Sequence, residues 1–465
     1  MIEVLYLTLD TYIESIRDKK IAVIGIGVSN LPLINLLAEK GCKVTACDKR
    51  QQIAETADAL EDAGVSLCLG DDYLEHLSHD IIFRTPGLHP DVPQLKNARR
   101  AGAVVTSEME LFFKLCPCKI IAVTGSDGKT TTTTIISKLM ESAGYNTHLG
   151  GNIGTPLLTR LPDIAPCDYA VLELSSFQLH SMYCKPDIAV ITNISPNHLD
   201  VHPDMADYVR AKTSVFKNQD ESCRLVLNMS DSYTPEFTAQ AKSQIMLFGT
   251  HNIPNNGAGL INGIIHTVEN GAVTPLMPAD EIRIPGAHNT ENYMAAFCAV
   301  SGLVSPDVCR QVAKSFGGVA HRLELVRIIH GVSYYNDSIA SSPTRTIAGL
   351  RSFKDEKIIL IAGGYDKNIP FDILGQEIVS RVSALFLVGD TSDKIRSAVL
   401  SSKGYNKDTL PIIIAESLKQ AIFSASNAAK AGDIVLLSPA CASFDQFVNF
   451  VQRGDCFKEI VRELE

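Results

Sequence analysis

The sequence predicts an α/β protein of three consecutive domains, Rossmann-like at both ends and built around a phosphate-loop turn in the centre. Three observations lead to this prediction. A strand, a glycine turn and a helix recur in succession along the chain, the pattern of parallel α/β units. The predicted strands are near-continuously apolar, as strands covered on both faces are. The length of 465 residues suggests about three domains, which we expect to span residues 1–110, 111–318 and 319–465.

Composition excludes several functional classes. The formal charge of −10 argues against a nucleic-acid surface, which is normally basic. The chain has no apolar run of about 18 residues or more, so we expect no membrane span. The twelve cysteines are scattered without framework spacing, and residues 1–10 lack the features of a signal peptide. We therefore expect a cytoplasmic protein with free thiols.

The first domain opens with a Rossmann-like βαβ unit. An apolar strand at 20–24 leads into the Gly25-Ile26-Gly27 turn and a helix, and a second strand at 43–48 ends in Asp48. Asn30 stands near the place of the third glycine of the dinucleotide pattern, which argues against NAD and leaves another nucleotide open. A doubly wound core without a ligand is the alternative. Asp48 favours a ligand, because a ribose is usually held at the end of the second strand.

The central domain contains the most informative stretch of the chain. A strand at 120–124 is followed by Gly125-Ser126-Asp127-Gly128-Lys129-Thr130-Thr131 and a helix-like segment at 132–143. The glycines let backbone N–H groups approach phosphate oxygens, Lys129 adds a positive charge, and the Thr130 hydroxyl can hold Mg²⁺.

This loop departs from the full Walker pattern at one position. Val123 stands where the pattern has its first glycine, so an ordinary βα turn with a surface lysine is the alternative. The strand before the loop and the helix after it are the structural context that supports a phosphate loop. We therefore expect a P-loop-type ATPase domain that binds a nucleoside triphosphate.

Polar residues at the ends of two further strands complete the expected site. Glu173 lies near the end of the apolar strand at 169–174, and His198 lies just past the strand at 187–194. Because the carboxyl ends of parallel strands meet at one edge of the sheet, we expect Glu173, His198 and Thr130 to converge there and hold Mg²⁺. In isolation, Glu173 could be an exposed strand-end acid and His198 a turn residue.

Three features link the central and third domains. Residues 245–285 are rich in glycine and asparagine and predict a loop-rich excursion with short strands. Asn289 and Asn292 then share a helix face, where their amides can pair with a purine edge or serve as capping and surface groups. The arginine of His321-Arg322 suits phosphate oxygens, with an interdomain salt bridge as the alternative.

The sequence of the third domain predicts another parallel α/β unit, with strands at 357–362, 384–389 and 433–438. Lys367 follows the first of these strands, a good place to meet a carboxylate. Cys441 invites interpretation as a nucleophile, but no nearby histidine supports that role. We expect a small buried thiol there instead.

Taken together, these motifs resemble those of the Mur ligases, ATP-dependent amide-forming enzymes of peptidoglycan synthesis. The resemblance rests on the phosphate loop at 124–131, on the stretch 286–292 and on His321-Arg322, and it runs from the first block to the C-terminus. Three further stretches resemble the family members that add D-glutamate: 150–154, 172–179 and 437–447.

The resemblance implies a reaction and its participants. ATP, with Mg²⁺, would convert the carboxylate of UDP-N-acetylmuramoyl-L-alanine into an acyl phosphate, which the amine of D-glutamate would attack. Ile339 stands where many relatives carry a lysine near the incoming amino acid. We expect a monomer that binds neither nucleic acid nor membrane.

The resemblance also assigns roles to residues. Lys212, on a predicted helix at 205–216, matches the family lysine that is carbamylated by CO₂. The catalytic residues would be Lys129, His198 and Lys212. ATP would be bound by Gly125, Ser126, Asp127, Gly128, Lys129, Thr130, Thr131, Asn289, Arg322 and Asp337. The UDP substrate would be bound by Ser29, Asp48, Arg50 and Asn152, D-glutamate by Lys367, Ser443 and Phe450, and Mg²⁺ by Thr130, Glu173, His198 and carbamylated Lys212.

Three other functions remain open on the sequence. Another Mur-type or a folylpolyglutamate-type ligase would share the ATP loop and the amide chemistry. An NAD-dependent dehydrogenase could be built on the Gly25-Ile26-Gly27 turn. A non-catalytic nucleotide-binding regulator would bind ATP without releasing phosphate in response to an amino acid.

Overall fold

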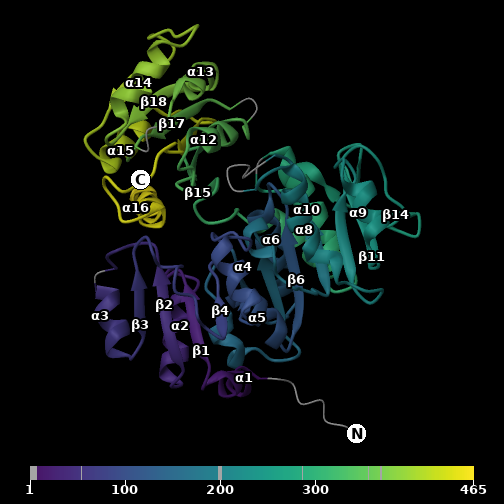
Figure 1. Ribbon diagram of the computed structural model, residues 1–465. Helices are drawn as coiled ribbons and strands as arrows, with labels where there is room; N and C mark the ends of the chain where they lie inside the picture. Colours follow the sequence, from purple (N-terminus) through teal and green to yellow (C-terminus); the bar gives the residue numbers. More distant parts are fainter. Residues whose placement is uncertain (1–7, 54, 197–201, 285, 354–355, 367–368) are drawn as a thin grey trace. The chain divides into compact units, whose positions relative to one another are not determined.

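The computed structural model describes residues 8–53, 55–196, 202–284, 286–353, 356–366 and 369–465. It contains three β-sheets with helices packed against them (Figure 1). The chain divides into two compact units, one formed by residues 1–279 and 291–312 and the other by 280–290 and 313–465. The first two sheets lie in the first unit and the third sheet lies in the second.

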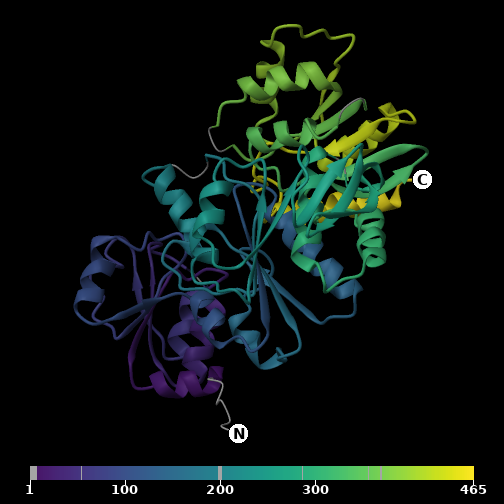
Figure 2. The same ribbon diagram turned by 90° about the vertical axis from the view of Figure 1, so that its right-hand side faces the viewer.

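The N-terminal sheet is fully parallel, with strand order β3-β2-β1-β4-β5 and helices on both sides (Figure 2). The expected βαβ unit is confirmed as β1 (Lys20–Ile24), α2 (Leu31–Glu39) and β2 (Lys43–Asp48). Asn30 precedes α2 and is buried, and its side-chain amide donates to the Ile24 carbonyl at 2.8 Å. The other elements are α1 (Leu9–Ile16), α3 (Glu55–Asp62), β3 (Ser66–Leu69), β4 (Ile81–Phe83), α4 (Pro93–Arg100), β5 (Val104–Thr106) and α5 (Glu108–Leu115).

The central sheet has strand order β14-β13-β12-β11-β10-β9-β6-β8-β7. Its strands are parallel from β7 through β12, and β13 and β14 run antiparallel at one edge. The helices and 3₁₀ turns are α6 (Lys129–Ser142), η1 (Leu158–Asp163), α7 (Ser176–Leu179), α8 (Met205–Lys217), α9 (Thr234–Gln240), η2 (Ala279–Glu281), α10 (Ala287–Val300) and α11 (Pro306–Ser315). The strands are β6 (Lys119–Thr124), β7 (Thr147–Gly151), β8 (Tyr169–Glu173), β9 (Ile188–Ile191), β10 (Arg224–Asn228), β11 (Gln244–Gly249), β12 (Gly257–Ile261), β13 (Ile264–Glu269) and β14 (Ala272–Pro278).

The C-terminal sheet has strand order β15-β16-β20-β17-β18-β19 and is parallel except for the β15–β16 pair. This confirms the parallel α/β unit expected from three apolar runs. The strands are β15 (Glu324–Ile329), β16 (Val332–Asn336), β17 (Ile358–Ala362), β18 (Val382–Leu387), β19 (Ile412–Ile414) and β20 (Ile434–Leu437). The helices are α12 (Pro343–Leu350), α13 (Asp372–Arg381), α14 (Ser392–Leu400), α15 (Leu418–Ala428) and α16 (Phe450–Glu463).

The first two sheets share one continuous hydrophobic core. Ile21 and Phe83 of the N-terminal sheet belong to the same buried cluster as Leu172 and Leu225 of the central sheet. Phe112 of α5 lies in this cluster and is fully buried. Because burial of apolar surface is the main stabilising term in folding, these two sheets form one compact unit.

The structure also refines several sequence expectations. Helix α6 begins at Lys129, three residues before the predicted start, and β9 is shorter than the predicted strand at 187–194. The loop-rich excursion at 245–285 consists largely of β11–β14, which extend the central sheet. All twelve cysteines are free, as expected. No helix within the described residues is long and apolar enough to cross a membrane.

Candidate functional site

The glycine loop between β6 and α6 has the conformation of a tight phosphate-type turn. Gly125 has φ +145°, and a Cβ added there would lie 1.9 Å from Oγ1 of Thr192. Gly128 has φ +77°, and a Cβ there would lie 2.3 Å from Oδ1 of Asn292. Both positions therefore require glycine, for conformational freedom and for space. The loop leads directly into the N-terminus of α6, and a helix N-terminus favours an anion because its first N–H groups have no acceptor within the helix.

Residues at the end of β9 hold this loop in place. The Ser126 N–H donates to the Asn193 carbonyl at 2.8 Å, and the Asp127 N–H donates to Oδ1 of Asn193 at 2.9 Å. The Thr192 hydroxyl donates to the Asp127 carbonyl at 2.6 Å. Lys129 donates from Nζ to the Ser126 carbonyl at 2.9 Å. The loop is therefore preorganised by the neighbouring strand.

The strands that carry the expected site residues are neighbours. In the parallel pairing of β6 with β8, Val123 lies opposite Glu173, and in the pairing of β6 with β9, Thr124 lies opposite Ile191. The carboxyl ends of the three strands therefore meet beside the glycine loop, as the sequence argument required.

Lys212 projects from α8 into the protein interior beside the glycine loop. The residue is only 1% exposed, and its Nζ donates to the Gly125 carbonyl at 2.7 Å. Burial, followed by the positive charge of Lys129, lowers the pKa of Lys212 well below its usual range, against the opposing effect of Asp127 and Glu173. The lowered pKa favours the neutral amine, the nucleophilic form of lysine.

Glu173 presents a buried carboxylate at the end of β8. Its Oε1 accepts a hydrogen bond from the Asn152 side chain at 2.8 Å. Its Oε2 is buried and has no hydrogen-bond partner among the described residues. A buried carboxylate oxygen without a partner is costly, and a hard cation such as Mg²⁺ would satisfy it. The unpartnered oxygen of Glu173 therefore fits a magnesium ion.

A cavity of about 200 Å³ lies within the first unit, between segments of the N-terminal and central sheets. Ser29 and Asn152, both expected at the UDP-substrate site, line this cavity together. Glu108 also lines it, and burial raises the pKa of this carboxyl to about 7. The other lining residues are Val28, Asn30, Arg84, Pro86, Ser107, Met109, Gly151, Gly154, Pro156 and Gln178.

Asp48 and Arg50, predicted at the same site, are not among the residues that line this cavity. Arg50 donates from Nε to Oδ1 of Asp48 at 2.9 Å and from Nη2 to Oδ2 at 2.8 Å. Oδ2 also accepts the Ile26 N–H at 2.8 Å. The Arg50 hydrogen bond is the main reason that the pKa of Asp48 falls to about 2. This ion pair fixes the glycine turn after β1.

In the second unit, Asp337 and Arg322 lie within electrostatic range of each other. Asp337 follows β16 and accepts from the Ser438 hydroxyl at 2.7 Å and from the Leu323 N–H at 3.3 Å. Burial raises the pKa of Asp337 to about 7, although these hydrogen bonds and Arg322 oppose the shift. Asn289 lies in the first turn of α10 and is buried.

Two of the predicted amino-acid-binding residues, Ser443 and Phe450, lie on either side of the turn before α16. Ser443 is buried. Phe450 begins α16, its carbonyl accepts from the Ser338 hydroxyl at 2.8 Å, and its ring centroid lies 6.0 Å from that of His321. Cys441 is buried, and burial raises the pKa of its thiol to about 11. This agrees with the small buried thiol expected from the sequence.

His198 and Lys367 lie outside the described residues, so their roles stay predictions. Sequence reasoning missed two contributors to the sites. Asn193 supports the glycine loop, and its place at the end of a predicted strand was the available signal. Arg453 of α16 is buried and donates to the carbonyls of Ser338 and Cys441 at 2.9 and 3.1 Å. No sequence pattern marks Arg453.

Comparison with known proteins identifies three consecutive family matches. Residues 19–107 match the Mur ligase MurD-like N-terminal domain, 123–300 the Mur ligase middle domain, and 321–441 the Mur ligase glutamate ligase domain. The domain limits at 110 and 318 stay predictions.

Curated relatives match nearly the whole chain. A UDP-N-acetylmuramoylalanine–D-glutamate ligase of Acetivibrio thermocellus is 49% identical over 98% of this chain and 99% of its own length. A ligase of the same name from Clostridium kluyveri is 48% identical over 98% of this chain and 99% of its own length.

Solved structures share the fold at low sequence identity. A UDP-N-acetylmuramate–alanine ligase of Thermotoga maritima has a TM-score of 0.56 at 17% identity, covering 96% of this chain and 99% of that chain. A second ligase from the same organism, solved with ADP, has a TM-score of 0.53 at 16% identity and covers 97% of each chain. The three-domain fold, the glycine loop and the near-complete alignments agree: the chain belongs to the Mur ligase family.

Proposed function

We propose that this chain is an ATP-dependent ligase that adds D-glutamate to UDP-N-acetylmuramoyl-L-alanine during peptidoglycan synthesis. One structural observation carries the ligase chemistry: a buried lysine, Lys212, and a buried carboxylate, Glu173, flank a preorganised glycine loop. The choice of substrates comes from the names of relatives that are 47–49% identical over nearly the whole chain.

The reaction begins with phosphoryl transfer from ATP to the alanyl carboxylate of the UDP substrate. The glycine loop and the N-terminus of α6 hold the phosphates, and Lys129 and Arg322 neutralise the charge that develops on them. The resulting acyl phosphate has phosphate as its leaving group. The neutral amine of D-glutamate attacks the carbonyl, and the tetrahedral intermediate collapses to an amide as its nitrogen loses a proton and phosphate leaves. No protein nucleophile is required.

Magnesium would bind at the strand ends and would screen the negative charge of the transferred phosphoryl group. Thr130, Glu173 and His198 would hold it. Carbamylation of Lys212 would add an oxygen ligand, and the lowered pKa of its amine supports this modification, because only the neutral amine attacks CO₂.

The remaining residues bind and orient the substrates. Adenine and ribose would meet Asn289 and Asp337. The UDP moiety would bind at the N-terminal sheet through Ser29, Asp48, Arg50 and Asn152, and D-glutamate would bind through Lys367, Ser443 and Phe450. We assign these tasks to domains spanning 1–110, 111–318 and 319–465 and expect the protein to act as a monomer in the cytoplasm.

The test is phosphate release by the purified protein with ATP, Mg²⁺ and UDP-N-acetylmuramoyl-L-alanine. D-Glutamate should stimulate release and yield the amide product, whereas L-glutamate, L-alanine and a diamino acid should not. Stimulation by a different amino acid, or by a folate in place of the UDP substrate, would favour another ligase of this type. ATP binding with no amino-acid-dependent phosphate release would refute the proposal.

A further inference from the structure

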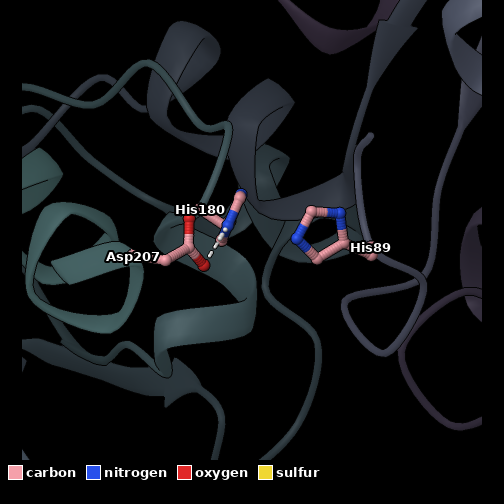
Figure 3. Close-up of side chains that lie close together, drawn as sticks. All are labelled: His89, His180 and Asp207. Carbon is pink, nitrogen blue, oxygen red and sulfur yellow. Dashed lines mark hydrogen bonds and ion pairs between the residues drawn. The ribbon is translucent and has the colours of Figure 1, made fainter. Parts of the chain in front are cut away.

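Three polar side chains from distant parts of the chain form a compact cluster in the first unit. His89 lies in the loop between β4 and α4, His180 caps the C-terminal end of α7, and Asp207 lies in the first turn of α8 (Figure 3). Each offers a potential ligand atom, and these atoms lie within 4.8 Å of one another. We call these three residues the histidine cluster.

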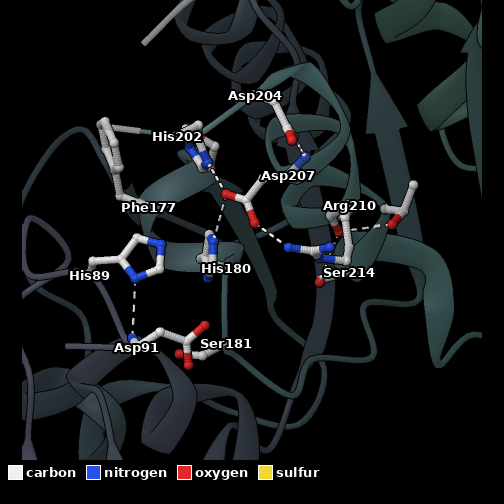
Figure 4. A network of polar contacts seen from close by, with 12 residues as sticks. His89, Asp91, Phe177, His180, Ser181, His202, Asp204, Asp207, Arg210 and Ser214 are labelled. Atoms are coloured by element: carbon white, nitrogen blue, oxygen red, sulfur yellow. Dashed lines mark hydrogen bonds and ion pairs between the residues drawn. The ribbon is translucent and has the colours of Figure 1, made fainter. Parts of the chain in front are cut away.

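The carboxylate of the histidine cluster is held as a buried anion (Figure 4). Oδ2 of Asp207 accepts hydrogen bonds from Nε2 of His180 at 2.9 Å and from Nδ1 of His202 at 2.7 Å. The other oxygen pairs with Arg210. Burial raises the pKa of Asp207, but the hydrogen bonds from His202 and His180, with the nearby charges, outweigh burial and lower it to about 2. His202 in turn contacts the Ser176 hydroxyl at 2.9 Å.

His89 directs an unpartnered nitrogen toward this anion. The Asp91 N–H donates to Nδ1 of His89 at 3.1 Å. Nε2 of His89 is buried, has no hydrogen-bond partner among the described residues, and faces the edge of His180 that binds Asp207 (Figures 3 and 4). The two imidazole rings meet edge to face, with centroids 4.5 Å apart. Buried polar atoms are nearly always paired, so this one requires an explanation.

We propose that His89, His180 and Asp207 bind a divalent transition-metal ion, most naturally zinc. Two imidazoles and one carboxylate are a typical donor set for such ions. Magnesium prefers oxygen ligands, so this donor set is distinct from the magnesium site of the proposed reaction. No established role of the chain accounts for this donor set.

The ion would occupy the position of the proton that His180 shares with Asp207. Bonds of about 2.0–2.2 Å place tetrahedral ligand atoms roughly 3.3–3.6 Å apart. The ligand atoms of His180 and Asp207, now 2.9 Å apart, would therefore separate slightly, and a small rotation of His89 would bring its Nε2 to the ion. Each neutral ring would move its proton from Nε2 to Nδ1. For His89 this gives up the exposed contact with the Asp91 N–H. For His180 it breaks no second hydrogen bond, because Nδ1 has no partner among the described residues.

Such an ion would tie the β4–α4 loop of the N-terminal sheet to α7 and α8 of the central sheet. Arg84 makes a parallel link, because its guanidinium donates to the Phe177 carbonyl at 3.1 Å and the Ser181 hydroxyl at 3.0 Å. The residue after Asp207 is Tyr208, whose hydroxyl lies 2.9 Å from that of Ser126 in the glycine loop. The metal would therefore stabilise the contact between the N-terminal and central sheets, close to the residues that support the glycine loop.

The test is cobalt and zinc binding to the purified full chain in excess Mg²⁺, which occupies oxygen-rich sites. We compare the wild type with H89Q and, as a matched control, with H251Q, in which the replaced histidine is exposed. The wild type and H251Q should bind one more ion than H89Q and show the visible absorption of tetrahedral cobalt. Zinc should raise their thermal midpoints and leave that of H89Q unchanged.

Equal metal stoichiometry and equal cobalt spectra in the wild type and H89Q would overturn the proposal, as would an absence of binding by the wild type. The histidine cluster would then be a hydrogen-bonded contact only. Should H89Q fail to fold by circular dichroism, H180Q provides the same comparison. None of these measurements depends on ligase activity.

Discussion

Replacing Lys212 with methionine should change the pH dependence of stability in a defined direction. The side chain is buried, and burial together with Lys129 lowers the pKa of its amine. Between that lowered pKa and the value of about 10.4 in the unfolded chain, the unfolded state binds one proton more than the folded state. The free energy of unfolding of the wild type should therefore rise with pH across this window, and the Lys212 contribution should be least favourable below it.

The magnitude follows from proton linkage. When unfolding takes up one proton, the free energy of unfolding rises by about 1.4 kcal/mol per pH unit. K212M lacks the amine that takes up this proton. The free energy of unfolding of K212M minus that of the wild type should therefore fall by about 1.4 kcal/mol per pH unit as the pH rises through this window. Below the window the variant should be as stable as the wild type or more so, because it no longer buries an ammonium group.

The assay is urea unfolding of both proteins at a series of pH values in CO₂-depleted buffer, since a carbamate would remove the titrating amine. K217M is the matched control, because Lys217 lies on the same helix and is exposed. The free energy of unfolding of K217M should change with pH in parallel with that of the wild type. K212M should also lose most of its phosphate release. Parallel curves for the wild type and K212M would show that the Lys212 amine titrates normally.

Three further outcomes are expected. G125A should lose ATP affinity in equilibrium dialysis, because the new Cβ meets Oγ1 of Thr192, whereas G144A has open space and should show only a stability loss of about 1–2 kcal/mol in thermal unfolding. E173Q should weaken Mg²⁺-dependent phosphate release by roughly 10–100-fold at limiting Mg²⁺, and a Mg²⁺ titration with an unchanged midpoint would contradict the cation assignment. C441A should keep the wild-type kcat, since burial keeps the Cys441 thiol protonated; a large loss of kcat in the folded variant would argue for a chemical role.

Periodic and strand-end features were readable from the sequence because they depend on local physics. The apolar runs predicted the strands β1, β2, β8, β17 and β20 to within about one residue at each end. The strand–glycine–helix pattern predicted the phosphate-type loop despite Val123. The rule that parallel strands end at one edge of the sheet predicted that the Glu173 end of β8 lies beside that loop.

Long-range contacts were not readable in this way. The carboxylate of Asp48 accepts the N–H of Ile26, which lies 22 residues away along the chain, and no local pattern indicates this contact. Lys212 could be singled out only by resemblance, because its burial depends on how α8 packs beside Gly125. Arg453 could not be singled out from the sequence either, because its hydrogen-bond partners lie 11 to 115 residues away along the chain.

The sequence by itself determined the three-domain α/β architecture, the glycine loop and the family of the chain, because hydrophobic periodicity and short motifs are properties of neighbouring residues. Only the tertiary structure decided which charges are buried and which partners they meet. The lowered pKa of Lys212, the unpartnered oxygen of Glu173 and the meeting of His89 with His180 and Asp207 all arise from segments far apart in the chain. Desolvation and charge pairing act through space, so no pattern of adjacent residues encodes them.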